Sequence, residues 1–384
     1  MMKARLLSIL VIFASLFCAC GRQHTVAEKQ GDTLRLKYAE NILIVRYADR
    51  TEVTMKDPWN RGRVLHRYLL LSTGETGADA KALRRTPSAD ATIVHVPLRR
   101  SVVFNTAHAW LLGQLGATDA IAGVADLEYM QLPELHRRVG QGRVANCGSS
   151  MSPDIERLIA TAPDAILLSP FENSGGYGRL EELGTPLIEC ADYMETSALG
   201  RAEWMRFYGL LYGRQATADS LFAVVERNYL SLSRRAKAAK PRRSILTEKL
   251  TGNTWYVAGG KSSVGQLIAD AGGSYAWSAD NHSGSLALPF ETVLDRAGDA
   301  DVWVFNDLSP QLTYQRLLSE YHGYGQLRAF REHNVWYVNS LQVPYFEQVS
   351  FRPDWLLRDY VILLHPELKD LGTPRYYRTV ERHI

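Results

Sequence analysis

The sequence predicts an α/β protein with two lobes that a long helix joins, and with a small β-rich segment in front of them. From Arg99 onward, short apolar strands alternate with amphipathic helices, which is typical of a parallel sheet covered on both faces. Helical spacing over residues 197–240 interrupts this alternation, and it resumes after Pro241. The 384 residues are enough for two or three domains with real cores.

The composition is that of a folded globular protein. Hydrophobic residues make up 46% and charged residues 22%, and there is no collagen-like period, heptad run or long polar tract. Lys and Arg number 44 against 41 Asp and Glu, so the formal net charge of +3 is too small to favour nucleic acid as a partner.

The chain opens with a segment typical of a secretory signal. Lys3 and Arg5 precede an apolar run over residues 6–17, which would form about 18 Å of helix, too short for a bilayer core of about 30 Å. We therefore expect residues 1–19 to be a cleaved signal peptide and the rest to lack a membrane span.

The end of this segment, Phe17-Cys18-Ala19-Cys20, resembles the cleavage box of bacterial lipoproteins. Ala19 suits the position before the cut and Cys20 the acylated position, although Phe17 stands where Leu is usual. The resemblance implies a lipid on Cys20, and ordinary secretion with cleavage nearby is the alternative.

Between this segment and the first lobe, the sequence predicts two short regions. Residues 20–33 are polar and we expect a tether. Residues 34–98 contain short β-rich runs separated by turns, which predict a small antiparallel appendage of unknown role, with runs at 34–38, 42–47 and 63–71.

The first lobe is predicted over residues 99–196. Ser152 as N-cap and Pro153 in the first turn mark the start of its second helix. The expected order is strand 101–104, helix 106–116, strand 120–124, helix 152–162, and strands 164–168 and 186–188.

The joining helix and the second lobe follow. Residues 197–240 have apolar residues at helical spacing, with an interruption expected at Tyr212-Gly213-Arg214, and Pro241 ends the stretch. The second lobe is predicted over 241–384, with strands at 243–246, 254–257, 301–305 and 334–338.

The two lobes contain a matching unit. A helix with apolar residues at i, i+3, i+4 and i+7 precedes an aspartate and an apolar strand in each lobe, and a glutamate follows the first apolar residue, Glu156 in one and Glu291 in the other. These glutamates lie beside the buried stripe. The alternative is that both are ordinary residues on the rim of an amphipathic helix.

The sequence contains no set of residues typical of catalysis or of a metal site. Gly259-Gly260-Lys261-Ser262 resembles the end of a phosphate-binding loop, but Trp255 stands where that loop needs glycine. There is no Gly-x-Ser-x-Gly elbow, and the histidines lack ligand spacing. Cys147 and Cys190 are able to pair in an oxidising compartment, and the sequence leaves this open. We expect no enzyme activity and no bound metal or cofactor.

Polar, aromatic and glycine-rich segments stand where strands should end. Loops at the carboxyl ends of parallel strands are where α/β sheets bind ligands, so we expect these segments to line one cleft between the lobes. Some of the aromatic residues are alternatively core. The candidate ligand-binding residues are Asn105, His108, Ser149, Met151, Phe171, Glu172, Tyr193, Lys261, Ser262, Trp277, Ser283 and Ser285.

Several segments between Arg99 and Leu371 together form a pattern found in a known family. They include 102–104, 121–124, Gly148–Glu156, Ala162–Leu167, Leu183–Leu187, Gly284–Glu291 and Arg352-Pro353-Asp354. Over this range the chain resembles the substrate-binding proteins of ABC importers for metal chelates, the iron-siderophore, haem and cobalamin group. The resemblance implies two Rossmann-like lobes bridged by a long helix, with Glu156 and Glu291 engaging arginines of the permease. Segment 34–98 departs from the family core and resembles an extension in relatives from the Bacteroides group.

We therefore expect a monomeric, lipid-anchored periplasmic receptor that captures an iron-siderophore, haem or cobalamin and delivers it to an ABC permease in the inner membrane. Haem would favour His108 or Tyr193 as axial ligand, and a siderophore would favour Arg179 or Lys261. The alternatives are a two-lobed hydrolase or transferase with its site in the same cleft, and a receptor for free zinc or manganese.

Overall fold

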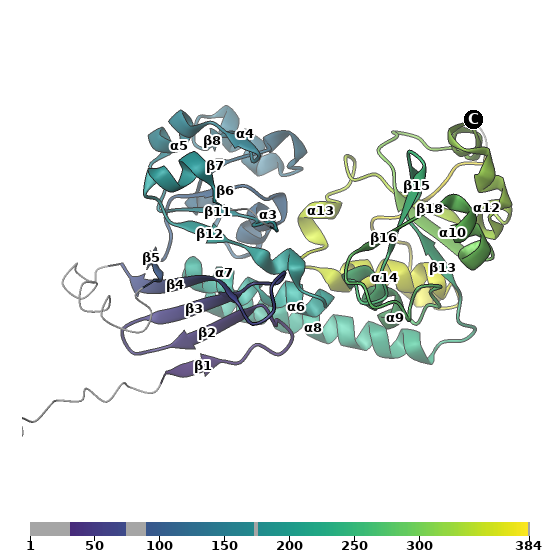
Figure 1. Ribbon diagram of the computed structural model, residues 1–384, viewed down its shortest axis with the longest axis horizontal. Helices are drawn as coiled ribbons and strands as arrows, with labels where there is room; N and C mark the ends of the chain where they lie inside the picture. The colour runs from purple at the N-terminus through teal and green to yellow at the C-terminus, as the bar shows by residue number, and fades with distance from the viewer. Residues whose placement is uncertain (1–30, 74–89, 173–175, 383–384) are drawn as a thin grey trace, which may run out of the picture.

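Two α/β lobes stand side by side on a long helix, and a separate β-sheet lies beneath the first lobe (Figure 1). The computed structural model describes residues 31–73, 90–172 and 176–382. The expected signal peptide, most of the tether and Cys20 lie outside the described residues. The predicted fold class is confirmed. Within the described part of the chain, no helix is both long and apolar enough to cross a membrane.

The first lobe is built on a parallel five-stranded sheet. Its strand order is β12-β11-β6-β7-β8, and the inner strand β11 is an aliphatic run buried on both faces. All five strands therefore end at the same edge, where the following loops meet. The strands are β6 Ser101–Val103, β7 Ile121–Val124, β8 Ala145–Asn146, β11 Ala165–Leu168 and β12 Leu187–Glu189, and the helices are α3 Thr106–Gln114, α4 Pro133–Gly140 and α5 Ile155–Thr161.

The second lobe contains a smaller parallel sheet with one antiparallel edge strand, in the order β13-β17-β18-β19. Its strands are β13 Ile245–Thr247, β17 Val302–Asn306, β18 Val335–Val338 and β19 Arg378–Thr379. The helices are α9 Ser263–Asp270, α10 Phe290–Ala297, α11 Tyr314–Glu320, α12 Arg328–Arg331, α13 Tyr345–Gln348 and α14 Pro353–Leu364.

The strand expected at 254–257 does not belong to this parallel sheet, which corrects the prediction for the second lobe. It is β15 (Thr254–Ala258), and it pairs antiparallel with β14 (Leu250–Thr251) and β16 (Ser285–Leu288). Only two residues, Gly252 and Asn253, separate β14 from β15, and Gly252 has φ +60°. A two-residue turn can join antiparallel strands only, because parallel neighbours need a long crossover.

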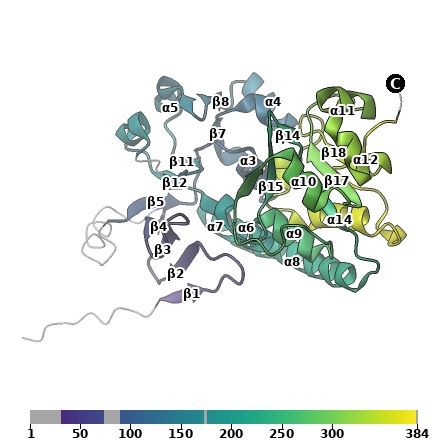
Figure 2. The same cartoon turned by 45° about the vertical axis from the view of Figure 1, so that its right-hand side comes forward.

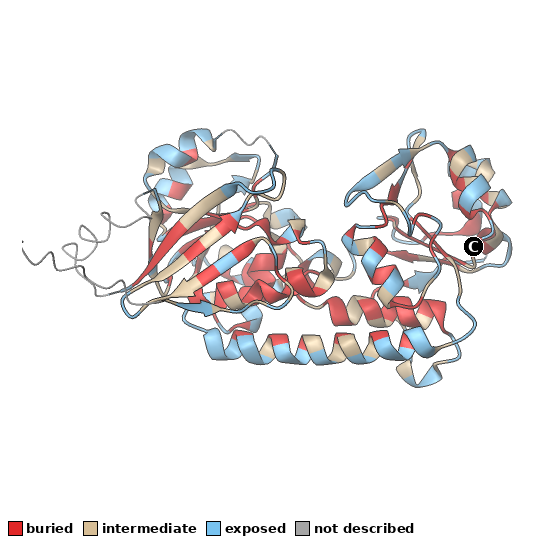
Figure 3. Ribbon diagram, turned by 60° about the horizontal axis from the view of Figure 1, so that its bottom comes forward, coloured by how far each residue is buried: buried red, intermediate tan, exposed pale blue. Residues whose placement is uncertain are grey.

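A helical segment joins the lobes. It consists of α6 (Ala198–Glu203), α7 (Met205–Leu211) and α8 (Gln215–Ala238). The helical conformation is interrupted at Tyr212-Gly213-Arg214, as predicted. The 24 residues of α8 span about 36 Å, enough to pass under both lobes. Figure 3 shows an exposed outer side along α8, whose other side faces the protein.

The N-terminal sheet has five strands in chain order: β1 Asp32–Leu34, β2 Ile42–Arg46, β3 Thr51–Lys56, β4 Val64–Ser72 and β5 Thr92–Val96. The expectation of an antiparallel sheet is wrong for its last pair, because β5 runs parallel to β4. The 19 residues between these two strands are long enough for a crossover. The first strand also begins at Asp32, two residues before the expected start of the β-rich segment at residue 34.

The N-terminal sheet lies beside α6 and α7 (Figure 2), and two buried carboxylates at the start of this helical segment bind residues 37–41. Glu203, which is fully buried, accepts hydrogen bonds from the backbone N–H groups of residues 37, 38 and 39 at 2.7–3.0 Å. Glu195 accepts from the N–H groups of Glu40 and Asn41 and from the indole of Trp204. Successive backbone donors that converge on one charge bind tightly, so residues 37–41 are part of the lobe and not a loose appendage.

Candidate functional site

A pocket of about 320 Å³ opens at the edge of the first lobe where β6, β7 and β11 end. Asn105 caps α3 there: its Oδ1 accepts from the N–H of Ala107 at 2.8 Å, while its Nδ2 donates to Ser169 at 3.4 Å. Asp126, after β7, has φ +53° and accepts from both the N–H and the hydroxyl of Ser150. These side-chain bonds join the loop after β6 to the loop after β11, and the loop after β7 to Ser150, so they restrain the walls of the pocket.

Large apolar side chains rim this pocket and remain exposed. The exposed fraction is 82% for Met151, 66% for Tyr129 and 53% for Phe171. Apolar groups gathered in this way mark a binding surface, since a folded chain otherwise buries them. A second pocket of about 360 Å³ shares Met151, Phe171 and Tyr177 with the first and adds Arg179.

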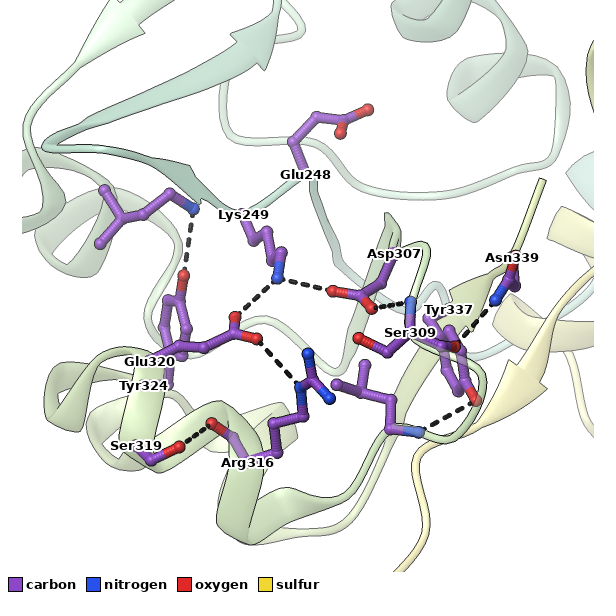
Figure 4. Close-up of polar contacts among 12 residues, drawn as sticks. Glu248, Lys249, Asp307, Ser309, Arg316, Ser319, Glu320, Tyr324, Tyr337 and Asn339 are labelled. Atoms are coloured by element: carbon purple, nitrogen blue, oxygen red, sulfur yellow. Dashed lines mark hydrogen bonds and ion pairs between the residues drawn. The ribbon is translucent and has the colours of Figure 1, made fainter. Parts of the chain in front are cut away.

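In the second lobe, polar residues directly follow each parallel strand (Figure 4). Lys249, after β13, lies 2.6 Å from both the Asp307 carboxylate after β17 and the Glu320 carboxylate on α11. Burial alone would lower the pKa of Lys249 and raise the pKa of Asp307, but their hydrogen bonds shift both pKa values the other way and hold both groups charged. Asn339, after β18, donates to the backbone oxygen of Ser309 at 2.8 Å.

The two lobes meet at α13. Glu347 on this helix is 2% exposed, and its Oε1 accepts from the hydroxyl of Thr106 at 3.0 Å and from the N–H of Gln131 at 2.8 Å. The Gln131 side chain also donates to the backbone oxygen of Ser340. Thr106 lines the pocket of the first lobe. One buried carboxylate of the second lobe therefore fixes the pocket edge of the first.

Three of the expected cleft residues are structural instead. His108 is buried, and its Nε2 lies 2.8 Å from Asp192 Oδ1. Ser262 caps α9 by accepting from the N–H of Gly265, and Trp277 is buried in the core. Local sequence does not reveal these partners, because Asp192 lies 84 residues from His108. His108 is therefore excluded as a haem ligand.

Asp192 is itself held by charge. Burial would raise the pKa of this carboxyl, but His108 and Arg201 outweigh that effect and lower its pKa below the ordinary range. The group therefore stays ionised inside the lobe, where it fixes the loop after β12.

The remaining candidates fall into two groups. Around the pocket of the first lobe, Asn105, Met151 and Phe171 line the wall; Ser149 and Glu172 are exposed next to it; and Tyr193 donates its hydroxyl to the Pro170 oxygen at 2.5 Å. In the second lobe, Lys261, Ser283 and Ser285 are exposed at the ends of β15 and β16. No residue of that second group lines either of these two pockets, and one continuous pocket through the candidates stays a prediction.

Sequence reasoning missed Asp126, Tyr129, Tyr177 and Glu347. A usable signal existed for Asp126, since it stands two residues after the apolar strand β7. Glu347 gives no such signal, because its partner Thr106 is 241 residues away.

The remaining predicted residues are placed as follows. Glu156 and Glu291 are exposed in the first turns of α5 and α10, one on each lobe. Cys147 and Cys190 are buried free thiols, and burial raises the pKa of Cys147 to about 11. Among the described residues, no three His, Cys, Asp or Glu side chains lie close enough to hold a metal ion, so nothing there favours the free-metal alternative.

Comparison with known proteins extends these observations. The profile of the periplasmic binding protein family matches residues 102–340. An uncharacterized lipoprotein of Methanocaldococcus jannaschii is 23% identical over 347 residues, which cover 86% of this chain and 82% of that protein.

Two solved structures share the fold. A periplasmic haem-binding protein from Pseudomonas aeruginosa has a TM-score of 0.57 at 17% identity and covers 75% of this chain and 99% of its own. A protein of Staphylococcus epidermidis, described as a possible iron-binding, periplasmic solute-binding protein, has a TM-score of 0.56 at 18% identity and covers 70% and 99%.

Proposed function

Because the chain belongs to the periplasmic binding protein family, we propose that it is a lipid-anchored receptor that captures a metal chelate and delivers it to an ABC permease in the inner membrane. The observation that carries this proposal is the aromatic pocket at the ends of β6, β7 and β11, bordered by α13 of the second lobe. Its exposed Tyr129, Met151 and Phe171 suit a large, flat or macrocyclic ligand. The chain needs no chemistry of its own for this task.

Two structural neighbours and the two candidate axial ligands bear on the class of ligand. One structural neighbour is a haem-binding protein and another is described as iron-binding, so an iron-siderophore or haem is proposed, with cobalamin as the third candidate. With His108 buried and the Tyr193 hydroxyl bonded to Pro170, neither sequence-derived axial ligand is available to haem in this arrangement.

Purification from the native host tests the function. We expect iron or cobalt to co-purify in proportion to the protein, with a matching chelate by mass spectrometry and absorption spectroscopy. Phe171→Glu should abolish co-purification of the chelate, because it places a charge on the pocket rim. Leu43→Glu, at an exposed apolar residue of the N-terminal sheet, should leave co-purification unchanged. Absence of any chelate, together with hydrolase or transferase turnover in the cleft, would favour the enzyme alternative.

The lipid anchor is proposed on Cys20, with support from the lipoprotein name of the relative. Cys20→Ser should move the protein from the membrane fraction to the soluble fraction, because a thioether-linked lipid cannot form on serine. Cys18→Ser is the matched control and should stay with the membrane. If the Cys20→Ser protein also sediments with membranes, the anchor lies elsewhere.

A further inference from the structure

Glu248 has a backbone conformation that a non-glycine residue rarely adopts. It follows β13 directly and has φ +64°. Its N–H donates to the oxygen of Val304 at 2.8 Å and its own oxygen accepts from the Trp303 indole at 2.7 Å. Both backbone groups are thus held by β17, so the sheet sets the direction of the side chain. Such strain persists where the surrounding structure imposes it, and it is frequent at ligand sites.

The carboxylate of Glu248 has no hydrogen bond or ion pair with any described residue. Figure 4 shows it pointing away from Lys249, whose charge is already taken by Asp307 and Glu320. The residue has exposed surface, yet desolvation by the surrounding protein raises its pKa. Glu248 directly follows β13, so it lies at the carboxyl edge of the parallel sheet, which is the edge where α/β sheets bind ligands.

The sheet edge that carries Glu248 meets the first lobe. Ser340 follows β18 at this edge, and its backbone oxygen accepts from the Gln131 side chain of the first lobe. Burial first, and the Glu248 charge in addition, raise the pKa of Tyr345 to about 12. Tyr345 begins α13, the helix whose Glu347 accepts from Thr106 on the pocket wall. Glu248 and the aromatic pocket therefore both lie on the sides of the lobes that meet at α13.

Negative charge predominates among the residues around Glu248 and in the aromatic pocket. Among the described residues that line the aromatic pocket, Asp126 is the only charged one, and Lys249 is neutralised by two carboxylates. The second pocket adds one cation, Arg179, on the first lobe. A desolvated carboxylate repels an anion and forms strong, charge-assisted hydrogen bonds with amide or ammonium donors.

We infer that Glu248 contacts the ligand, and that this protein carries a chelate that is uncharged or cationic and presents hydrogen-bond donors to the second lobe. This inference rests on the proposed function. It excludes chelates with several free carboxylates or catecholates on the face that meets Glu248.

Binding measurements with four probes test the inference on the mature chain. The probes are cyanocobalamin, which is neutral and rich in amides; a cationic ferric trihydroxamate; haemin, with two carboxylates; and a polyanionic ferric tris-catecholate. We expect cyanocobalamin or the trihydroxamate to bind and the polyanion not to bind. Glu248→Gln should weaken binding about tenfold to hundredfold, the range for a hydrogen bond to a charged group.

Three further variants separate the effect of the strained backbone at Glu248 from the effect of its carboxylate. Glu248→Gly relieves the left-handed backbone, so it should raise the melting temperature by about 1–2 °C and still weaken binding. Ala162→Gly relieves φ +44° at the end of α5 and should raise the melting temperature with unchanged affinity. Glu182→Gln, at an exposed carboxylate of the first lobe, controls for charge and should change neither.

The outcomes distinguish the two proposals. If a chelate binds but all Glu248 variants keep the wild-type affinity, the inference fails and the receptor function stands. The inference also fails, and the receptor function also stands, if the ferric tris-catecholate binds and Arg179→Gln abolishes that binding. If no probe binds and nothing co-purifies with the wild-type protein, the proposed function fails and the inference falls with it.

Discussion

Reversing the charge of both lobe glutamates, Glu156→Arg together with Glu291→Arg, is expected to abolish chelate uptake while ligand affinity stays unchanged. Both carboxylates are exposed, one in the first turn of α5 and one in the first turn of α10. Arginines on a permease would pair with them bidentately, and the reversed protein would bring like charges together. We expect permease binding to weaken roughly a hundredfold or more.

The same double variant should fold normally. An exposed carboxylate near a helix N-terminus contributes only about 0.3–1 kcal/mol, so the melting temperature should fall by a few degrees at most. Glu182→Arg with Asp295→Arg makes the same charge change at exposed sites on the same two lobes and should leave uptake intact. Uptake of labelled chelate and permease pull-down are the measurements. Normal uptake by the double reversal would make both residues ordinary helix-rim glutamates, and a large loss of ligand affinity would place them in the pocket.

Glu203→Ala is expected to have the largest effect on stability. The substitution removes the acceptor for three successive backbone N–H groups of residues 37–39, in a site closed to water. Unsatisfied buried donors and a broken buried charge contact together predict a loss of about 2–5 kcal/mol. Glu203→Gln should have a free energy of unfolding between those of the wild-type protein and Glu203→Ala. Its amide keeps one acceptor oxygen but directs its NH2 group at the backbone N–H donors.

Glu226→Ala is the matched comparison. Glu226 joins the same segment through Lys37 and Tyr38, each at 2.6 Å, but it is partly exposed, so its loss should be below about 1 kcal/mol. Chemical denaturation gives the free energies of unfolding, and hydrogen exchange over residues 32–56 reports detachment of the sheet. Equal losses for Glu203→Ala and Glu226→Ala would contradict the role of the buried carboxylate.

Local patterns in the sequence predict much of the fold. The aliphatic run of β11 and the break at Tyr212-Gly213-Arg214 are each visible within a few residues of chain. The predicted cap of α5 is wrong, because Ser152 and Pro153 form a short strand, β10 (Ser152–Pro153), and Asp154 caps the helix by accepting from the N–H of Arg157. The pocket loops after β6 and β11 follow from the same patterns, because a parallel sheet brings its strand ends to one edge.

The failures concern partners that are distant in sequence. His108 has the residue type of a ligand, but its Asp192 partner and its burial become visible only in three dimensions. The strand at 254–257 has the apolar character of a parallel strand, and only the short Gly252 turn reveals its true pairing. Residue type predicts what a side chain is able to do, whereas tertiary contacts decide whether it is free to do it.

The five-stranded N-terminal sheet determines where a lipid on Cys20 can hold the molecule. In Figures 1 and 2, β1 lies at the lower edge of the N-terminal sheet, whereas α5, which carries Glu156, lies at the upper end of the first lobe. The stretch from Cys20 to β1 spans about 40 Å at full extension, and a folded body of this size is about 50 Å across. A receptor anchored in the same membrane as its permease would therefore have to lie on its side, with the tether nearly straight, to bring Glu156 to the permease. A receptor anchored in the opposite membrane would direct Glu156 across the periplasm without turning. Tether length thus limits the orientations from which a loaded receptor can reach its permease.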